Sequence, residues 1–146
     1  MLDEEARTIA AWRYEPPYSF YDADADPSDL ALLLSEEIRE GRYFSTFDQR
    51  GALVGFFEFK PDGGEIVIGL GLRPDLTGLG LGSAFLEAGL AFARERFQPA
   101  RFRLSVATFN ERAIRVYERA GFVPLRTYDH ETNGGVYPFL EMTRPA

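Results

Sequence analysis

Residues 73–83 read RPDLTGLGLGS, with a glycine at every second position from Gly78 to Gly82. An apolar run precedes this loop at residues 66–72, and a helical pattern of apolar side chains follows it at residues 83–97. Glycines at the start of a helix let main-chain N–H groups converge without obstruction by Cβ atoms, and the helix N-terminus adds about half a positive charge. The segment therefore predicts a strand, a loop suited to an anion such as a diphosphate, and a helix. The alternative is a loop whose glycines only allow positive φ angles and close packing.

Two other phosphate-binding motifs do not fit this loop. A Walker loop ends in Gly-Lys-Ser/Thr, and no lysine lies here. A dinucleotide-binding fingerprint needs a glycine three residues after Gly80, but Ser83 occupies that position, and no acidic residue ends a second strand about twenty residues later. The sequence therefore excludes both classes of nucleotide site.

Upstream of the loop, the sequence predicts one helix followed by an antiparallel meander. Asp26 before Pro27 is typical of an N-cap with proline at the first helical position, and the helical pattern then runs for about twelve residues until Gly41. Polar turns separate three apolar runs, and we expect strands at residues 42–47, 53–59 and 65–72.

Downstream of the glycine-rich helix, we expect a strand at residues 102–107 and a helix at residues 110–120. Gly121 is a predicted left-handed C-cap, with Phe122 packed back onto the last helical turn. A pair of strands at residues 123–128 and 136–142 would enclose a polar loop at residues 129–135. This order is typical of the α/β (α+β) class, with helices covering a mixed, mostly antiparallel sheet. No linker, repeat or low-complexity tract divides the chain, so we expect a single domain over residues 1–146.

Composition and charge narrow the classes of partner. The chain has 146 residues, of which 45% are hydrophobic and 27% charged, and no apolar run approaches the ~20 residues that span a bilayer. It has no cysteine, which excludes disulfides, thiolate nucleophiles and cysteine-bound metals. The amino terminus begins acidic and lacks the order of a secretory signal, so we expect a cytoplasmic protein and no membrane partner. A net charge of -7 with Lys60 as the only lysine disfavours nucleic acid. Such an acidic surface suits cationic amines, or serves solubility alone.

Three segments carry a resemblance to a known family. The run Thr77-Gly78-Leu79-Gly80-Leu81-Gly82 resembles the motif Arg/Gln-x-x-Gly-x-Gly/Ala of the GNAT superfamily of acetyl-CoA-dependent N-acetyltransferases in every position but the first. Residues 110–122, NERAIRVYERAGF, are similar to the family's second motif, Asn-x-x-Ala-x-x-x-Tyr-x-x-x-Gly-Phe, and residues 66–76 to its fourth strand. The resemblance covers about two fifths of the chain and implies a sheet of six to seven strands that splays between its central strands.

The resemblance implies acetyl-CoA as co-substrate and no metal. Its pantetheine arm would lie along the main chain of residues 70–72, between the strands that begin near Glu65 and Phe102, and a backbone N–H near Leu72 could stabilise the oxyanion of the attacked thioester. Threonine at the first motif position removes a side-chain contact of the family and leaves the main-chain cradle. The implied cofactor contacts are Leu70, Gly71, Leu72, Thr77, Gly78, Leu79, Gly80, Leu81, Gly82, Ser83, Asn110, Ala113 and Tyr117.

Tyr117 matches the family's position for the acid that protonates the departing thiolate, and its alternative role is a core tyrosine. Asn110 is an N-cap, a cofactor contact, or both. The attacking amine needs a base or a water relay. Glu65 is the nearest carboxylate on the predicted fourth strand and Glu58 the second choice, although both could be solvated charges at a strand edge. His130 fits a polar hairpin loop better than catalysis.

The aromatic stretch at residues 12–22 occupies the region that shapes the acceptor side in this family, and Tyr14, Tyr18 and Tyr21 are its predicted substrate contacts. Packing is their alternative role. The resemblance implies a ternary complex in which an amine, on a small molecule or a protein, attacks acetyl-CoA directly. A non-catalytic acyl-CoA-binding sensor or interaction module of the same fold is the alternative. A longer acyl group, the identity of the amine and a homodimer remain open.

Overall fold

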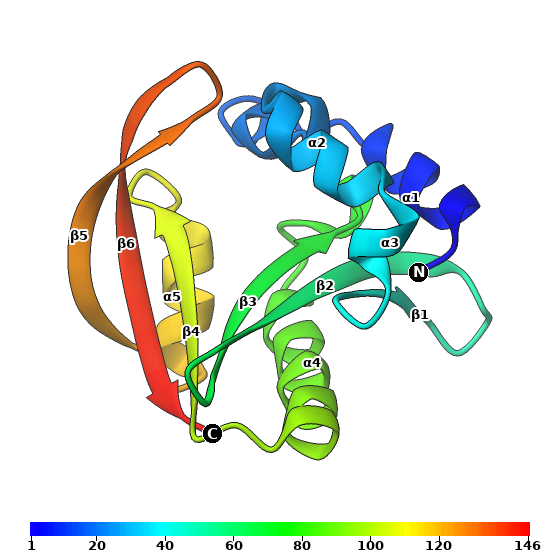
Figure 1. The fold of residues 1–146 in the computed structure, drawn as a ribbon. Helices are drawn as coiled ribbons and strands as arrows, with labels where there is room; N and C mark the ends of the chain where they lie inside the picture. The colour runs from blue at the N-terminus through cyan, green and yellow to red at the C-terminus, as the bar shows by residue number, and fades with distance from the viewer.

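The computed structural model describes all residues of the chain. It contains one six-stranded sheet of order β1-β2-β3-β4-β6-β5, in which only β3 and β4 are parallel (Figure 1). The strands are β1 (Tyr43–Phe47), β2 (Leu53–Asp62), β3 (Glu65–Leu72), β4 (Arg101–Ala107), β5 (Val123–Thr132) and β6 (Gly135–Pro145). The predicted mixed, mostly antiparallel sheet is confirmed.

Helices cover both sides of this sheet. They are α1 (Asp3–Ala10), α2 (Pro27–Leu34), α3 (Glu36–Arg39), α4 (Gly82–Phe97) and α5 (Glu111–Arg119), with short 3₁₀ turns at Tyr18–Tyr21, Ala23–Ala25 and Pro74–Leu76. In Figure 1, α4 and α5 lie behind the sheet, whereas α1, α2 and α3 gather on the other side near β1 and β2. No helix is both long and apolar enough to cross a bilayer.

The main core lies between the sheet and the pair α4 and α5. It contains 13 buried residues, among them Phe59, Leu86, Phe102 and Met142. Gly89 lets α4 approach the sheet closely, because a Cβ atom there would lie 2.3 Å from the Phe57 ring. A second, smaller cluster of four buried residues joins α1 and α2 to β1. Residues from both groups of helices line one cavity, which is described below.

The parallel pair β3 and β4 is joined over only part of its length. Only Glu65–Val67 pairs with Arg101–Arg103, and the strands diverge beyond Val67, as the family resemblance implied. The Arg73 amide donates to the Val54 carbonyl, so by the alternation of an antiparallel ladder the main-chain groups of Ile68, Leu70 and Leu72 point away from β2. They face the gap that the divergence opens.

The helix predicted from Asp26 to Gly41 is wrong in its length. Asp26 does cap it, since its Oδ1 accepts from the Ser28 amide at 2.8 Å. The helix nevertheless ends at Leu34, because Ser35 is extended (φ -84°, ψ 113°) and its Oγ accepts from the Ile38 amide at 3.4 Å to start α3. Serine favours such N-caps over helix interiors. The sequence analysis also missed α1.

The polar loop predicted at residues 129–135 is also wrong. β5 and β6 pair as far as Thr132 and Gly135, so the turn is only Asn133-Gly134, with φ angles of 53° and 74°. Asn-Gly is the preferred pair for a two-residue hairpin turn. Asp26 Oδ2 accepts from the Asn133 amide at 3.0 Å and from Thr132 Oγ1 at 3.1 Å, which ties the tip of this hairpin to the start of α2 (Figure 1). We call this contact the Asp26 latch.

Candidate active site

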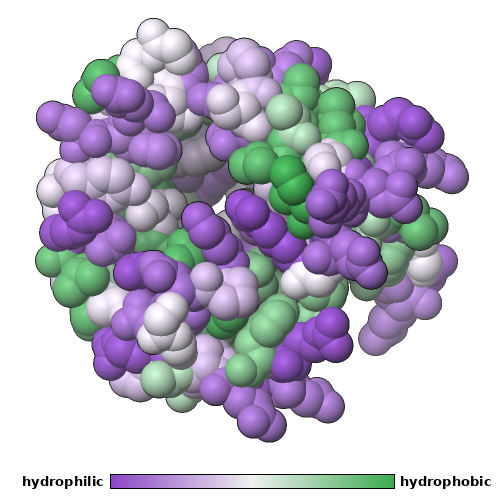
Figure 2. All heavy atoms as spheres, viewed as in Figure 1, coloured by the Kyte–Doolittle hydropathy of each residue, from purple (hydrophilic) through white to green (hydrophobic).

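A cavity of about 800 Å³ follows the open gap between β3 and β4. It extends from α1 and α2 past the strand ends to the glycine loop and α5. Figure 2 shows the molecule hollowed on this face, between the β5–β6 hairpin and the helices on the other side. We distinguish a cofactor end, formed by the strand ends, the loop and α5, from an acceptor end, formed by β2, α2 and the hairpin.

The cofactor end gathers most of the residues that the two motifs predicted. Of the predicted cofactor contacts, the cavity is lined by Leu70, Gly71, Leu72, Thr77, Gly78, Gly80, Gly82, Ser83, Asn110, Ala113 and Tyr117. Leu79 and Leu81 do not line it, and their side chains are exposed. The main chain of Gly71 belongs to the ladder with β2, whereas Leu70 and Leu72 turn theirs into the gap. The gap thus presents the N–H and C=O of Leu70 and the N–H of Leu72 to a ligand, whereas the Leu72 carbonyl accepts from the Tyr14 hydroxyl.

The glycine loop holds two left-handed residues, Gly78 (φ 72°) and Gly80 (φ 78°). Residues other than glycine rarely adopt these φ angles. Gly82 starts α4 close to α5, because a Cβ there would lie 3.3 Å from Val116 Cγ2. The Thr77 hydroxyl donates to the Pro74 carbonyl at 2.7 Å. The side chain at the first motif position is therefore engaged within its own turn.

Tyr117 lies on the wall of the cavity and packs against Phe122, with 6.2 Å between the ring centroids. Burial raises the pKa of the Tyr117 phenol, and the neighbouring Tyr21 phenol raises it further. The phenol is therefore protonated at neutral pH. Gly121, with φ 89°, and Phe122, 2% exposed, form the predicted C-cap of this helix. Asn110 is nearly buried, and its Oδ1 accepts from the Ala113 amide at 3.2 Å, which confirms the N-cap.

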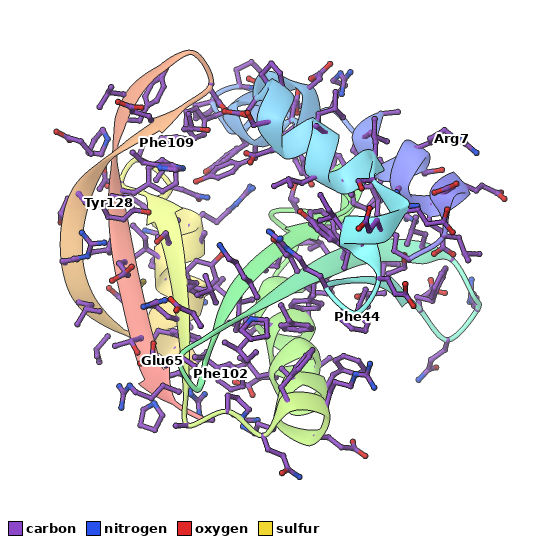
Figure 3. The ribbon with its side chains drawn as sticks, in the orientation of Figure 1. Arg7, Phe44, Glu65, Phe102, Phe109 and Tyr128 are labelled. Carbon is purple, nitrogen blue, oxygen red and sulfur yellow. The ribbon has the colours of Figure 1, made fainter.

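The two candidate bases have different positions. Glu65 begins β3 at the closed end of the gap, does not line the cavity, and lies 3.5 Å from Arg103 (Oε2 to Nη1). Figure 3 shows it beside Phe102, at the far end of the strand from the loop. Glu58 lines the cavity, and its Oε1 accepts from Arg42 Nε at 2.6 Å. Its Oε2 lies over Gly69 of the neighbouring strand β3, because a Cβ atom on Gly69 would be 3.1 Å from it. The structure brings Glu58, and not Glu65, to the site.

The acceptor end contains charged groups that the sequence analysis did not connect. Asp29, Glu58, Lys60 and His130 all line it. Burial raises the pKa of the Asp29 carboxyl, the Asp26 and Glu58 charges add to this, and His130 opposes it. His130 lies within β5, with its ring 4.7 Å from the Phe139 ring, so placing it in a polar loop was wrong. The alternation of β2 was the available signal for Glu58 and Lys60, which share one face of the strand.

The three predicted substrate tyrosines line the cavity, and each contacts the cofactor end. The Tyr14 hydroxyl donates to the Leu72 carbonyl at 2.8 Å, and the Tyr21 hydroxyl accepts from the Ala107 amide at 3.2 Å. These main-chain groups lie at the two diverging strand ends, and we call the pair Tyr14 and Tyr21 the tyrosine brace. Burial raises the pKa of both phenols. Tyr18 lies under the Arg112 guanidinium, 4.0 Å from it. Contact with the acceptor itself stays a prediction for all three.

Comparison with known proteins agrees with this geometry. The model of the acetyltransferase (GNAT) family matches residues 4–122. A mycothiol acetyltransferase of Salinispora arenicola is 40% identical over 116 residues, which cover 68% of this chain and 38% of that protein. The same enzyme of Propionibacterium freudenreichii is 43% identical over 86 residues, which cover 55% of this chain and 27% of that protein. The chain therefore spans well under half of the length of these curated relatives.

Two solved structures share the fold over nearly the whole chain. A chimera of the spermidine N-acetyltransferase of Vibrio cholerae has a TM-score of 0.75 at 19% identity, covering 99% of this chain and 92% of that one. A GNAT-family acetyltransferase of Bacillus anthracis also has a TM-score of 0.75, at 15% identity, covering 99% of this chain and 91% of that one. The predicted fold class is confirmed.

Proposed function

Because the chain belongs to the acetyltransferase (GNAT) family, we propose that it transfers an acetyl group from acetyl-CoA to a primary amine by direct attack in a ternary complex. One observation carries the proposal. The gap between β3 and β4 presents the main chain of Leu70 and the N–H of Leu72 in the same cavity as Tyr117, and this cavity continues to a second, charged compartment. A thioester and an amine can meet there, and holding two reactants together can supply several kcal/mol of a barrier.

The gap and the loop fit acetyl-CoA by their chemistry. Extended main-chain groups suit the amides of a pantetheine arm, and the left-handed Gly78 and Gly80 free the loop amides for a diphosphate. The Leu72 N–H would donate to the thioester carbonyl oxygen as negative charge develops on it, an interaction whose loss typically costs about 3–4 kcal/mol. The chain has no cysteine, so it cannot form a cysteinyl acetyl-enzyme.

Glu58 replaces Glu65 as the proposed base. An ordinary amine with a pKa of about 10.4 is mostly protonated at pH 7, and deprotonating it costs about 4–5 kcal/mol. The Glu58 carboxylate, directly or through water, would receive the proton that the amine loses as the new N–C bond forms and the C–S bond breaks. Arg42 holds one Glu58 oxygen, which leaves Oε2 for this role.

Tyr117 would donate a hydrogen bond to the departing sulfur. A thiol has a pKa of about 8.5 and an ordinary phenol about 10, so full transfer of the proton from a phenol of raised pKa is uphill by at least about 2 kcal/mol. Partial donation to the developing thiolate carries no such penalty. We therefore assign Tyr117 the role of a donor that stabilises the leaving group.

The remaining expectations are narrower proposals. We propose that the acceptor is a small-molecule amine or a protein amino group, since members of this family acetylate amines. A single domain, a cytoplasmic location and the absence of a metal, of nucleic acid and of a membrane partner stay predictions.

Release of free thiol from acetyl-CoA, followed with a panel of primary amines, tests the proposal. We expect release that depends on one class of amine, and Tyr117→Phe should slow it by about 10²-fold or more while the affinity for CoA is nearly kept. CoA binding without thiol release, whatever the amine, would favour the acyl-CoA sensor instead.

A further inference from the structure

Arg112 reaches from the first turn of α5 to the glycine loop. Its Nη1 would lie 3.3 Å from a Cβ atom on Gly78, which places the guanidinium against the loop's backbone. The centre of the same guanidinium lies 4.0 Å from the centroid of the Tyr18 ring. Both Arg112 and Gly78 line the cavity. A cation is therefore fixed beside the loop by an aromatic face.

No acidic side chain neutralises Arg112. Four arginines line the cavity, and of these only Arg42 pairs with a carboxylate, that of Glu58. Arg112 has no such partner, and neither have Arg115 and Arg119, which line the same cavity. In a chain of net charge -7, three unpaired cations along one helix indicate a place for an anion.

The loop itself offers no side-chain cation. The Thr77 hydroxyl is bound to the Pro74 carbonyl. Arg73, at the start of the segment, is held by Asp75, with 2.6 Å between Nε and Oδ1. A dianionic group on the loop amides would have to find its counter-charge on another element, and Arg112 is the arginine positioned against the loop.

We propose that Arg112 binds the diphosphate of CoA and supplies from α5 the side-chain contact that Thr77 does not make. The inference rests on the proposed function, since it takes CoA as the ligand of the loop. A guanidinium presents a planar fork of N–H donors that matches phosphate oxygens. Tyr18 is then a positioning residue, because stacking restricts the orientation of that fork. This assigns Tyr18 to the cofactor end and not to the acceptor.

Calorimetric titration with three ligands tests the assignment. CoA, dephospho-CoA and pantetheine share the same arm, whereas dephospho-CoA lacks the 3′-phosphate and pantetheine has no phosphate. We expect Arg112→Ala to weaken CoA and dephospho-CoA equally, by about 10- to 100-fold, and to leave pantetheine unchanged. Arg112→Lys should recover part of the loss, since it keeps the charge without the fork. Arg7→Ala removes the same charge from α1, far from the loop (Figure 3), and should bind all three as the wild type does.

Each other result overturns the assignment in a distinct way. Equal weakening of all three ligands by Arg112→Ala would make Arg112 a structural residue. A loss for CoA but not for dephospho-CoA would place Arg112 on the 3′-phosphate. Unchanged CoA affinity would refute the inference and leave the proposed function intact, whereas a wild-type protein that binds none of the three would refute both.

A double-mutant cycle tests the role of Tyr18. Tyr18→Leu should weaken CoA binding several-fold in the wild-type background and not at all in the Arg112→Ala background. The same weakening in both backgrounds would show that Tyr18 does not act through Arg112.

Discussion

The two ends of the cavity are built in different ways. At the cofactor end, two short motifs supply nearly everything, namely main-chain groups of the β3 end, the glycine loop and one face of α5. At the acceptor end, the charged groups come from three elements that are distant in the sequence, α2, β2 and β5. A ligand common to a family can be held by a local pattern, whereas a particular acceptor is recognised by side chains that only tertiary structure brings together. Substitutions at one end should therefore leave binding at the other end unchanged.

Replacing each of the two candidate bases by glutamine is the strongest test of this separation. Glu58→Gln should lower kcat/KM for the amine by about 10²-fold near neutral pH, because proton removal is lost. Activity should recover as the pH rises and free amine accumulates. A pH–rate profile measures this, and calorimetry should find CoA affinity unchanged.

Glu65→Gln is the matched control for Glu58→Gln. It removes a carboxylate one strand away that does not line the cavity, so kcat/KM should stay at the wild-type value. Equal losses in both variants would mean that negative charge near the sheet, and not a base at the acceptor end, supports the reaction.

The tyrosine brace should affect the cofactor end alone. Tyr14→Phe and Tyr21→Phe each leave a main-chain group at a strand end without its partner, and we expect the KM for acetyl-CoA to rise about 5- to 10-fold in each. The KM for the amine should hardly change. Tyr137→Phe is the control in steady-state kinetics, because it keeps the ring that packs against Phe20 and removes a hydroxyl that makes no hydrogen bond. A rise in the amine KM instead would return these tyrosines to the acceptor side.

The Asp26 latch should affect the acceptor end alone. Asp26→Ala frees the hairpin tip from α2, and we expect the amine KM to rise about threefold with CoA affinity unchanged. Hydrogen bonds from the Asn133 and Asp29 amides lower the pKa of the Asp26 carboxyl. Its contribution to stability is therefore present above the ordinary carboxyl pKa and is lost as the pH falls through the lowered value. An unchanged amine KM would contradict a role for the latch.

At alkaline pH, a buried tyrosine at either end of the cavity should reduce the stability of the protein by the same amount. Burial raises the pKa of Tyr117 at the cofactor end and of Tyr43 near the acceptor end. Each buried neutral phenol contributes to the free energy of unfolding, and this contribution is fully present below the ordinary phenol pKa of about 10. Above that pH it falls, because the phenol ionises in the unfolded chain while it is still protonated in the folded one. From pH 10 to 11, Tyr117→Phe and Tyr43→Phe should each lose about 1 kcal/mol less of the free energy of unfolding than the wild type. Denaturant titrations at both pH values measure this, and equal losses would contradict burial of the phenols.

Most of the helices, strands and caps that depend on neighbouring residues could be predicted from the sequence. The strand at Glu65–Leu72, the helix after the glycine loop and the caps around Asn110 and Gly121 were predicted because neighbouring residues determine them. The break at Ser35 was not predicted, and the hairpin of β5 and β6 was predicted without its extension through residues 129–132. The Ser35 cap is a local bond to the Ile38 amide, but it lies within a helical pattern of apolar residues that runs through the break. The extended hairpin is held by Asp26, which lies 107 residues from Asn133 in the sequence, so no local pattern indicates it.

The base was the least predictable part of the candidate site. Glu65 and Glu58 are both acidic residues on adjacent strands, and the sequence alone favoured the one on the strand nearest the motif. The outcome depends on where β3 and β4 part, since Glu65 lies in the paired half and Glu58 lies beside Gly69, just beyond it. No local sequence pattern indicates the residue at which β3 and β4 diverge.

The divergence of β3 and β4 creates two strand edges in the middle of a sheet. Unpaired edges usually attract a further strand, from the same or another molecule, and this is a common route to aggregation. Here Tyr14 and Tyr21 occupy the last main-chain group at the open end of each edge, so an extended segment entering there would first have to displace them. The two side chains that flank the gap thus also protect the sheet from edge-to-edge association.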